Sequence, residues 1–210
     1  MSYWLQNLNP EQREAVSHNQ GPLLILAGAG SGKTTVLVSR TGRLIAEKLT
    51  TPERVCVLTF TNKAANELKS RVAKKLGPVA AKVWAGTFHG FGLQFLKEHW
   101  QEAGLPKRFG VIDGGDAQSI LKDLLREHKA YEKSNLNVEA VMAKIGRIRE
   151  TGKASAFDDT IESAAAAVLA PKFVKRMRHL GVVDFEELLL RPLKMLKENE
   201  GIGKKDRGPF

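Results

Sequence analysis

The sequence predicts an α/β fold in which a parallel sheet with intervening helices occupies the first half of the chain and a helical insertion occupies the second. In the first hundred residues, short apolar runs alternate with helix-like segments, an order typical of βαβ units. In the second half, apolar residues recur at helical spacing and no convincing buried strand interrupts them. The length of 210 residues suits one large domain or two small ones.

Composition excludes several classes of protein. With 42% hydrophobic and 27% charged residues, the chain is globular rather than collagen-like or disordered. No apolar run approaches the roughly 18–20 residues that span a bilayer, and residues 1–20 are too polar for a secretory signal. Cys56 is the only cysteine, which excludes an intramolecular disulfide and a cysteine-based zinc site. We therefore expect a cytoplasmic protein.

The chain is strongly basic. Its 33 Lys and Arg residues against 23 Asp and Glu give a formal net charge of +10. This charge favours a polyanionic partner, with nucleic acid as the first expectation and an acidic membrane surface as the second.

The first expected elements surround a glycine-rich segment. Asn9 and Pro10 have the residue types of a helix N-cap and a first helical position, so a short helix is expected to begin there. Residues 22–27 form a continuous apolar run, which predicts a strand buried on both faces. A helix over about 33–48 follows the glycines.

Two further strand–helix pairs complete the predicted sheet. Residues 55–60 indicate a second buried strand, followed by a helix over 62–76 that Asn62 caps and Gly77 ends. Residues 82–87 indicate a third strand, followed by a helix through residue 100.

The second half is expected to contain a turn and then helices. The turn falls at residues 113–116, and the last ten residues, 201–210, lack periodicity and are expected to be disordered. After a first helical repeat near Leu121, the apolar spacing predicts helices over 138–150, 158–169, 171–180 and 185–197.

The segment from Ala27 to Thr34 carries the clearest chemistry. It reads Ala-Gly-Ala-Gly-Ser-Gly-Lys-Thr between a predicted strand and helix, the context of a phosphate-binding loop. Glycines let backbone N–H groups surround phosphate oxygens, while Lys33 reaches the β- and γ-phosphates and the Thr34 hydroxyl ligates Mg²⁺. The alternative is a glycine-rich turn without a ligand. We expect a nucleotide site with Lys33 and Thr34 in the catalytic positions, made by Ala29, Gly30, Ser31, Gly32, Lys33, Thr34 and Thr35.

Gln12 lies about twenty residues upstream of this loop, on the first predicted helix. A side-chain amide can bind adenine bidentately, since it offers one donor and one acceptor. By itself, a glutamine on an exposed helix is more often a solvated side chain.

Polar and aromatic residues follow the second and third predicted strands, where ligands gather in an open α/β sheet. Phe60, Thr61, Asn62 and Lys63 suit single-stranded nucleic acid, which stacks on aromatic rings and pairs with cations. In the alternative, Phe60 belongs to the core and Asn62 is only a helix cap. Thr87 and His89 follow the third strand, although a lone histidine is more often structural. The surrounding segment is basic, which usually means a solvated face; its cations are Lys63, Lys69, Arg71, Lys74, Lys75 and Lys82.

Two acidic residues open the last predicted helix. Asp184 at the N-cap and Glu187 three residues later form a variant of the capping box. We favour this structural role over metal binding because capping accounts for both carboxylates.

Several of these segments resemble, in order and spacing, the motifs of superfamily 1A DNA helicases of the UvrD/Rep/PcrA type. Residues 8–12 resemble the Q-motif, 27–34 motif I, 59–65 motif Ia and 87–89 motif Ib. Residues 184–190 resemble the acidic, aromatic helix that precedes motif II. The resemblance covers about residues 5–200.

The resemblance implies a RecA-like P-loop motor that uses ATP and Mg²⁺ to move 3′→5′ on single-stranded DNA and to unwind duplex DNA. It implies that Gln12 reads adenine and that the DNA track is lined by Phe60, Thr61, Asn62, Lys63, Thr87 and His89. The implied parts are subdomain 1A (1–107), helical subdomain 1B (108–180) contacting duplex DNA at the junction, a helix returning to 1A (181–200), and a disordered or aberrant tail (201–210).

The chain departs from this family after the helix at Asp184. A hydrophobic strand ending in Asp-Glu is expected there, whereas residues 201–210 follow instead. The Walker B acids, the arginine fingers and a second motor domain are missing from these residues, so we expect a truncated or frameshifted product that binds nucleotide weakly and does not unwind DNA. A sheet without those strands leaves an exposed edge and apolar surface prone to association.

Two other functions remain open. One is a nonenzymatic single-stranded DNA-binding or regulatory module, which salt-sensitive DNA binding without ATP hydrolysis would support. The other is a different P-loop enzyme, such as a nucleotide kinase. It would need phosphoacceptor-binding residues in place of the segments after Thr59 and Thr87, and the sequence shows none.

Overall fold

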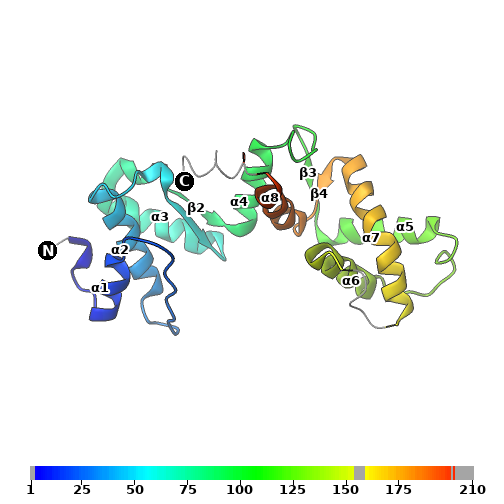
Figure 1. The fold of residues 1–210 in the computed structure, drawn as a ribbon, viewed down its shortest axis with the longest axis horizontal. Coiled ribbons are helices and arrows are strands. Elements are labelled where there is room, and N and C mark those ends of the chain that lie inside the picture. Colours follow the sequence, from blue (N-terminus) through cyan, green and yellow to red (C-terminus); the bar gives the residue numbers. More distant parts are fainter. Residues whose placement is uncertain (1–2, 154–158, 200, 202–210) are drawn as a thin grey trace. The chain divides into compact units, whose positions relative to one another are not determined.

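The computed structural model describes residues 3–153, 159–199 and 201 of the chain (Figure 1). These residues divide into two compact units: the first contains residues up to Phe91 together with Gly201, and the second begins at Gly92. Helices and short parallel strand pairs occur together, so the expected mixture of helices with a small parallel sheet is confirmed. Among the described residues, no helix combines the length and the apolar character needed to cross a membrane.

The first unit begins with two helices on either side of the glycine-rich segment. After a 3-10 turn at Tyr3–Leu5, α1 spans Pro10–Ser17 and is capped by Asn9, as predicted. The Asn9 side chain accepts a hydrogen bond from the Gln12 N–H at 2.8 Å, and Gln12 Oε1 accepts one from the Asn9 N–H at 3.1 Å. Helix α2 spans Lys33–Ala46. Together α1 and α2 enclose a small cluster of buried residues, Leu8, Ala15, Val16 and Val36.

Two parallel strands and a crossover helix complete this unit. Strands β1 (Cys56–Thr59) and β2 (Trp84–Thr87) pair in register, with Thr59 opposite Thr87. Helix α3 (Asn62–Leu76) connects them and ends at Gly77, which has a φ of 67°. Short 3-10 turns at Pro52–Arg54 and Gly77–Lys82 precede the two strands. The core between α2, α3 and the strands includes Val38, Ile45, Val57, Leu68, Val72 and Ala85.

The prediction of a buried strand over residues 22–27 is wrong. Leu24 and Leu26 are 83% and 88% exposed, and residues 22–27 have no strand assignment. Strands are stabilised by hydrogen bonds to neighbouring strands, and β1 and β2 pair only with each other in this part of the chain. An apolar run therefore predicts burial only where partner strands exist. The second strand is also less buried than expected, since Leu58 is 37% exposed.

We expect the exposed Leu24 and Leu26 side chains to make the chain self-associate, because apolar side chains beside unpaired backbone groups promote association. A Leu24→Glu/Leu26→Glu double variant should remain monomeric at concentrations where the parent chain forms larger species. Light scattering over a concentration series measures this difference. Leu49→Glu alters another half-exposed leucine outside the segment and serves as the control. Identical scattering from the two variants would contradict the prediction.

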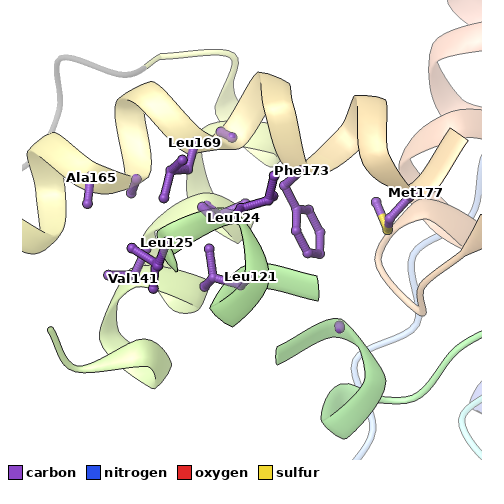
Figure 2. Packing of buried hydrophobic residues seen from close by; sticks show 12 residues of the cluster. Leu121, Leu124, Leu125, Val141, Ala165, Leu169, Phe173 and Met177 are labelled. Carbon is purple, nitrogen blue, oxygen red and sulfur yellow. The ribbon is translucent and has the colours of Figure 1, made fainter. Parts of the chain in front are cut away.

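The second unit is built from helices. Helix α4 spans Phe88–Glu98 and leads into it, followed by α5 (Gly114–Glu127), α6 (Val138–Thr151), α7 (Ile161–Leu180) and α8 (Glu187–Glu198). Apolar side chains of α5, α6 and α7 form its core, and Figure 2 shows how they gather beneath α7. The fully buried members include Leu121, Val141, Ile145, Leu169 and Phe173.

One long helix replaces two predicted ones. The segments predicted as helices over 158–169 and 171–180 form α7, which continues through Pro171, while residue 158 itself lies outside the described residues. Proline lacks the N–H of a helical hydrogen bond and usually interrupts a helix. Here Leu169 and Phe173 are both fully buried on either side of Pro171, so packing against α5 and α6 keeps the helix continuous.

Two smaller predictions for the second half are also wrong. Residues 114–116 form the first turn of α5 rather than a separate turn, and the Asp113 side chain caps this helix by accepting from the Asp116 N–H at 3.0 Å. Strands β3 (Gly110–Val111) and β4 (Val182–Val183) pair in parallel, although no strand was expected. Two residues are too few to show the alternation that identifies a strand. The predicted disordered tail lies outside the described residues apart from Gly201.

Candidate functional site

The glycine-rich segment forms an exposed loop that runs directly into α2. Gly30 and Gly32 have φ values of 73° and 85°, which glycine adopts without strain. Ser31 closes the turn, since its N–H and its hydroxyl both donate to the Gly28 carbonyl, at 3.4 and 2.7 Å. A Cβ placed on Gly28 or Gly30 would meet no atom within 4 Å. The loop therefore has both the backbone conformation and the space to receive an anion.

The first turn of α2 faces this loop with its backbone donors. The N-cap residue, Gly32, supplies no side-chain hydrogen bond to the helix. Uncapped N–H groups at the positive end of a helix dipole bind phosphate. Lys33 Nζ donates to the carbonyls of Ala27 and Gly28, at 3.0 and 2.6 Å, so the ammonium group lies over the loop. These backbone donors and the Lys33 ammonium group fit the phosphates of a nucleoside triphosphate.

The three remaining predicted nucleotide residues have open surroundings. Ala29 is an exposed member of the loop, and Thr34 and Thr35 are exposed in the first turn of α2. In phosphate-binding loops, a hydroxyl in this turn can ligate Mg²⁺.

Gln12 lies against the loop, so the structure brings together two features that are 19 residues apart in the sequence. Gln12 Nε2 donates to the Ser31 carbonyl at 3.0 Å, while Oε1 completes the cap of α1. The contact is close: a Cβ on Gly32 would lie only 2.7 Å from Gln12 Nε2. The alternative in which the Gln12 side chain contacts only solvent is therefore wrong.

Strands β1 and β2 present aromatic side chains at their carboxyl ends. Phe60 directly follows β1 and is 93% exposed, and Phe88 directly follows β2 and is 45% exposed. Their ring centroids lie 6.0 Å apart with an interplanar angle of 48°. Two exposed rings at the end of a parallel strand pair offer a surface on which nucleic-acid bases can stack.

This geometry contradicts one of the two interpretations of the segment after β1, the one that gave it a purely structural role. Phe60 is not in the core, and the N-cap of α3 is Thr61 rather than Asn62. The Thr61 hydroxyl accepts from the Ala64 N–H at 3.2 Å, which shifts the predicted cap by one residue. Asn62 and Lys63 are exposed in the first turn of α3. The alternative that assigned Phe60 to the core and Asn62 to the cap is wrong.

The end of β2 also leads into a helix that a threonine side chain caps. Thr87 Oγ1 accepts from the Gly90 N–H at 3.0 Å and so caps α4, and His89 is exposed in the first turn. Phe88 was not among the predicted site residues. The signal that could have identified it is its position, because Phe60 and Phe88 both come one residue after strands that are in register.

Comparison with known proteins identifies the family. The protein-family model for the UvrD/REP helicase N-terminal domain matches residues 8–208 of this chain. The chain belongs to the UvrD/REP helicase family. Over 198 residues it is 35% identical to the ATP-dependent DNA helicase PcrA of Bacillus subtilis (strain 168), a match that covers 91% of this chain and 26% of the relative.

A second UvrD/REP relative matches with similar identity and coverage. The chain is 32% identical over 200 residues to the ATP-dependent DNA helicase PcrA of Staphylococcus aureus (strain Mu50 / ATCC 700699), covering 94% of this chain and 27% of that protein. The chain therefore spans about a quarter of the length of these relatives and corresponds to their N-terminal portion.

The basic segment of this UvrD/REP domain is partly neutralised by local contacts. Arg71 pairs with Glu67 on α3, and Lys82 pairs with Glu53 at 2.8 Å. Lys75 Nζ lies 5.0 Å from the ring centroids of both Tyr3 and Trp4. The remaining predicted cations, Lys63, Lys69 and Lys74, are exposed on α3.

The acidic residues of the last helix have a structural role. Asp184 Oδ1 accepts from the Glu187 N–H at 2.8 Å, so the expected capping bond is present, although α8 is assigned from Glu187 with Glu186 as its N-cap. The reciprocal bond is absent because Glu187 binds Arg149 and Arg191 instead, at 2.9 and 2.6 Å. The described residues contain no group of three or more His, Cys, Asp or Glu side chains arranged to hold a metal ion.

Arg149 is the centre of this network. Its guanidinium also binds both carboxylate oxygens of Asp184, at 2.5 and 2.8 Å, and its side chain is only 6% exposed. Burial lowers the pKa of Arg149, but hydrogen bonds and charge from Asp184 and Glu187 outweigh this and raise it overall. Burial raises the pKa of the neighbouring Glu186 carboxyl, against the attraction of Arg149. The network joins α6 to the start of α8 and fixes these carboxylates within the fold.

Proposed function

We propose that the chain is the ATP- and DNA-binding N-terminal part of a 3′→5′ DNA helicase that acts where single-stranded DNA meets duplex. The observation that carries this proposal is the hydrogen bond from Gln12 Nε2 to the Ser31 carbonyl. It places an amide able to read adenine beside a loop able to hold phosphates, so one site can recognise both ends of ATP. The relatives' shared name, ATP-dependent DNA helicase, supports the same function.

Each part of the nucleotide has a proposed partner in this site. Gln12 recognises adenine, and the backbone N–H groups from Ala29 to Thr35 surround the phosphates. Lys33 exchanges its two carbonyl partners for β- and γ-phosphate oxygens, and Thr34 ligates Mg²⁺. When bound, the ion neutralises charge that develops on these phosphates.

The proposed DNA track follows the carboxyl ends of β1 and β2. Phe60 and Phe88 supply faces on which bases stack, while Lys63 and His89 supply polar or cationic partners for the DNA phosphates. Thr61, Asn62 and Thr87 lie at the starts of α3 and α4 beside them. In this proposal, residues 1–107 and 181–200 belong to an incomplete P-loop subdomain 1A, and residues 108–180 form the helical insertion 1B.

We further propose that these 210 residues by themselves bind nucleotide weakly and do not hydrolyse ATP or unwind DNA. The sequence contains no adjacent Asp-Glu pair of the kind that holds Mg²⁺ and orients the attacking water. Phosphoryl transfer depends almost entirely on such positioning and on charge stabilisation, and loss of an arginine finger alone costs about 10³–10⁵-fold in rate.

Nucleotide binding and hydrolysis test this proposal separately. Titration with a fluorescent ATP analogue should show binding that weakens at least about tenfold in Lys33→Ala, because a charge-assisted contact to phosphate is lost. The parent chain should show no ATP hydrolysis above that of Lys33→Ala, with or without single-stranded DNA. A parent chain that binds no ATP would contradict the proposed site. DNA-stimulated hydrolysis lost in Lys33→Ala would show instead that the chain is catalytically complete.

DNA stacking is tested with Phe60→Ala. We expect its affinity for a single-stranded oligonucleotide to fall by about 1–3 kcal/mol, the contribution of one base stacked on an aromatic ring. Fluorescence anisotropy at fixed salt measures the affinity. Tyr3→Ala removes another exposed aromatic ring of the same unit, away from the strand ends, and serves as the matched control. Equal losses in the two variants would refute a stacking role for Phe60.

A further inference from the structure

Helix α1 carries Gln12 but has few means of staying in place by itself. It is eight residues long, and isolated helices of this length are unstable in water. Its N-terminal end is held by the Asn9 cap, and its buried surface consists of Ala15 and Val16. Ala15 and Val16 pack with Leu8 and with Val36 of α2, so the position of Gln12 over the loop depends on this small cluster and on what holds the other end of α1.

Two arginines of α2 bind that other end. Arg40 Nη1 donates to the carbonyls of Ala15 and His18, at 2.8 and 2.5 Å. Arg43 Nη1 donates to the Val16 carbonyl at 3.0 Å and to Asn19 Oδ1 at 2.8 Å. Together they supply donors to the carbonyls that end α1 and to the residue following His18. These carbonyls lack helical partners and carry the negative end of the helix dipole, so cations are favoured there.

The two side chains are held in this arrangement against their mutual repulsion. Arg40 and Arg43 are three residues apart and therefore share one face of α2. Burial and the charge of Arg43 both lower the pKa of Arg40. Arg43 is 8% exposed and also pairs with Glu47 at 3.0 Å. Two adjacent, partly buried cations are consistent with a specific role for both.

Helix α2 connects this contact to the phosphate loop. It begins at Lys33, and Arg40 and Arg43 follow about 10 and 15 Å further along its axis at 1.5 Å per residue. One rigid helix thus presents backbone donors to the phosphates at its start and fixes α1 two to three turns later. We propose that Arg40 and Arg43 are positioning residues for base recognition, which hold α1 so that Gln12 stays over the phosphate loop. This inference rests on the proposed ATP site.

The inference separates recognition of the base from recognition of the phosphates. Replacing Arg40 or Arg43 should displace Gln12 while leaving the loop and Lys33 in place. In Arg40→Met and Arg43→Met we expect affinity for a fluorescent ATP analogue to fall about tenfold, to the value for the corresponding GTP analogue, since adenine-specific hydrogen bonds are lost. Affinity for inorganic tripolyphosphate, measured by its displacement of the fluorescent analogue, should stay within about twofold of the value for the parent chain. This result would show that each variant is folded. Arg40→Lys should restore part of the preference, because it keeps one donor.

Hydrogen exchange gives an independent readout. The amides of α1 should exchange faster in both methionine variants, while those of α3 remain unchanged. Arg13→Met is the control, because Arg13 is an exposed cation on α1 itself and makes no part of this contact with α2.

The outcomes are distinct. A parent chain that prefers ATP, with variants that lose the preference and keep tripolyphosphate, supports the inference. Variants that keep the preference overturn it and leave the proposed function standing. A parent chain that binds ATP and GTP equally also overturns it, although phosphate binding would stand. A parent chain that binds neither ATP nor tripolyphosphate removes both the inference and the proposed nucleotide site.

Discussion

Replacing Arg149 with methionine is expected to lower the free energy of unfolding of the second unit by about 3–5 kcal/mol. The substitution leaves Asp184, which is 7% exposed, buried without a cation, and it removes one of the two cations that bind Glu187, which is 8% exposed. Arg191 still binds Glu187, but Asp184 loses a bidentate partner. Removing one member of a buried ion pair costs more than the pair contributes, because the remaining charge is desolvated without compensation.

Urea unfolding, monitored by hydrogen exchange of the backbone amides of α5, α6 and α7, measures this loss in the second unit alone. Arg126→Met is the matched control, because it breaks an exposed pair with Asp123 whose side chains are 74% and 54% exposed. Exposed pairs contribute at most about 1 kcal/mol, so this variant should unfold almost like the parent. A loss in Arg149→Met as small as that of the control would show that the network does not stabilise the unit.

Phe173→Ala is expected to have a similarly large effect, about 3–5 kcal/mol, because it creates a cavity in the core beneath α7. Phe173 is completely buried and lies among Leu121, Leu124 and Leu169 in the cluster shown in Figure 2. The ring also lies under the Arg149 guanidinium, with 5.8 Å between Arg149 Cζ and the ring centroid.

The same unfolding experiment tests this second variant. Phe185→Ala removes a ring that is 53% exposed and should cost less than about 1 kcal/mol. If both phenylalanine variants unfolded alike, the cluster around Phe173 would not be the stabilising core of the second unit.

Much of the local structure could be predicted from sequence because its causes are local. Asn9 and Pro10 start α1, and Gly77 ends α3, through hydrogen bonds and backbone conformations that involve only a few neighbouring residues. The capping bond that the Glu187 N–H donates to the Asp184 carboxylate was predictable for the same reason. Pro171 shows the limit of such local rules, since long-range packing of Leu169 and Phe173 outweighs its effect on the helix.

The candidate site was predictable in its residue types and only partly in its geometry. The Gly-Lys-Thr signal identified the loop because phosphate binding requires these residue types at this spacing. The position of Phe88 directly after a strand was visible in the sequence, but the exposure of Phe60 and its distance from Phe88 were not, since both depend on how two strands far apart in the chain pair. The same is true of Arg40 and Arg43, whose partners lie more than twenty residues away.

The sequence by itself determined the family, the order of its conserved segments, the position of the glycine-rich loop and most helix boundaries, because these depend on residue types and short-range spacing. The tertiary structure alone decided that residues 22–26 are exposed, that α7 continues through Pro171 and that Gln12 contacts Ser31. Each of these depends on which distant backbone or side chain supplies a partner. Strand pairing, buried charge and the contact between α1 and α2 all require such partners, and only the folded chain brings them together.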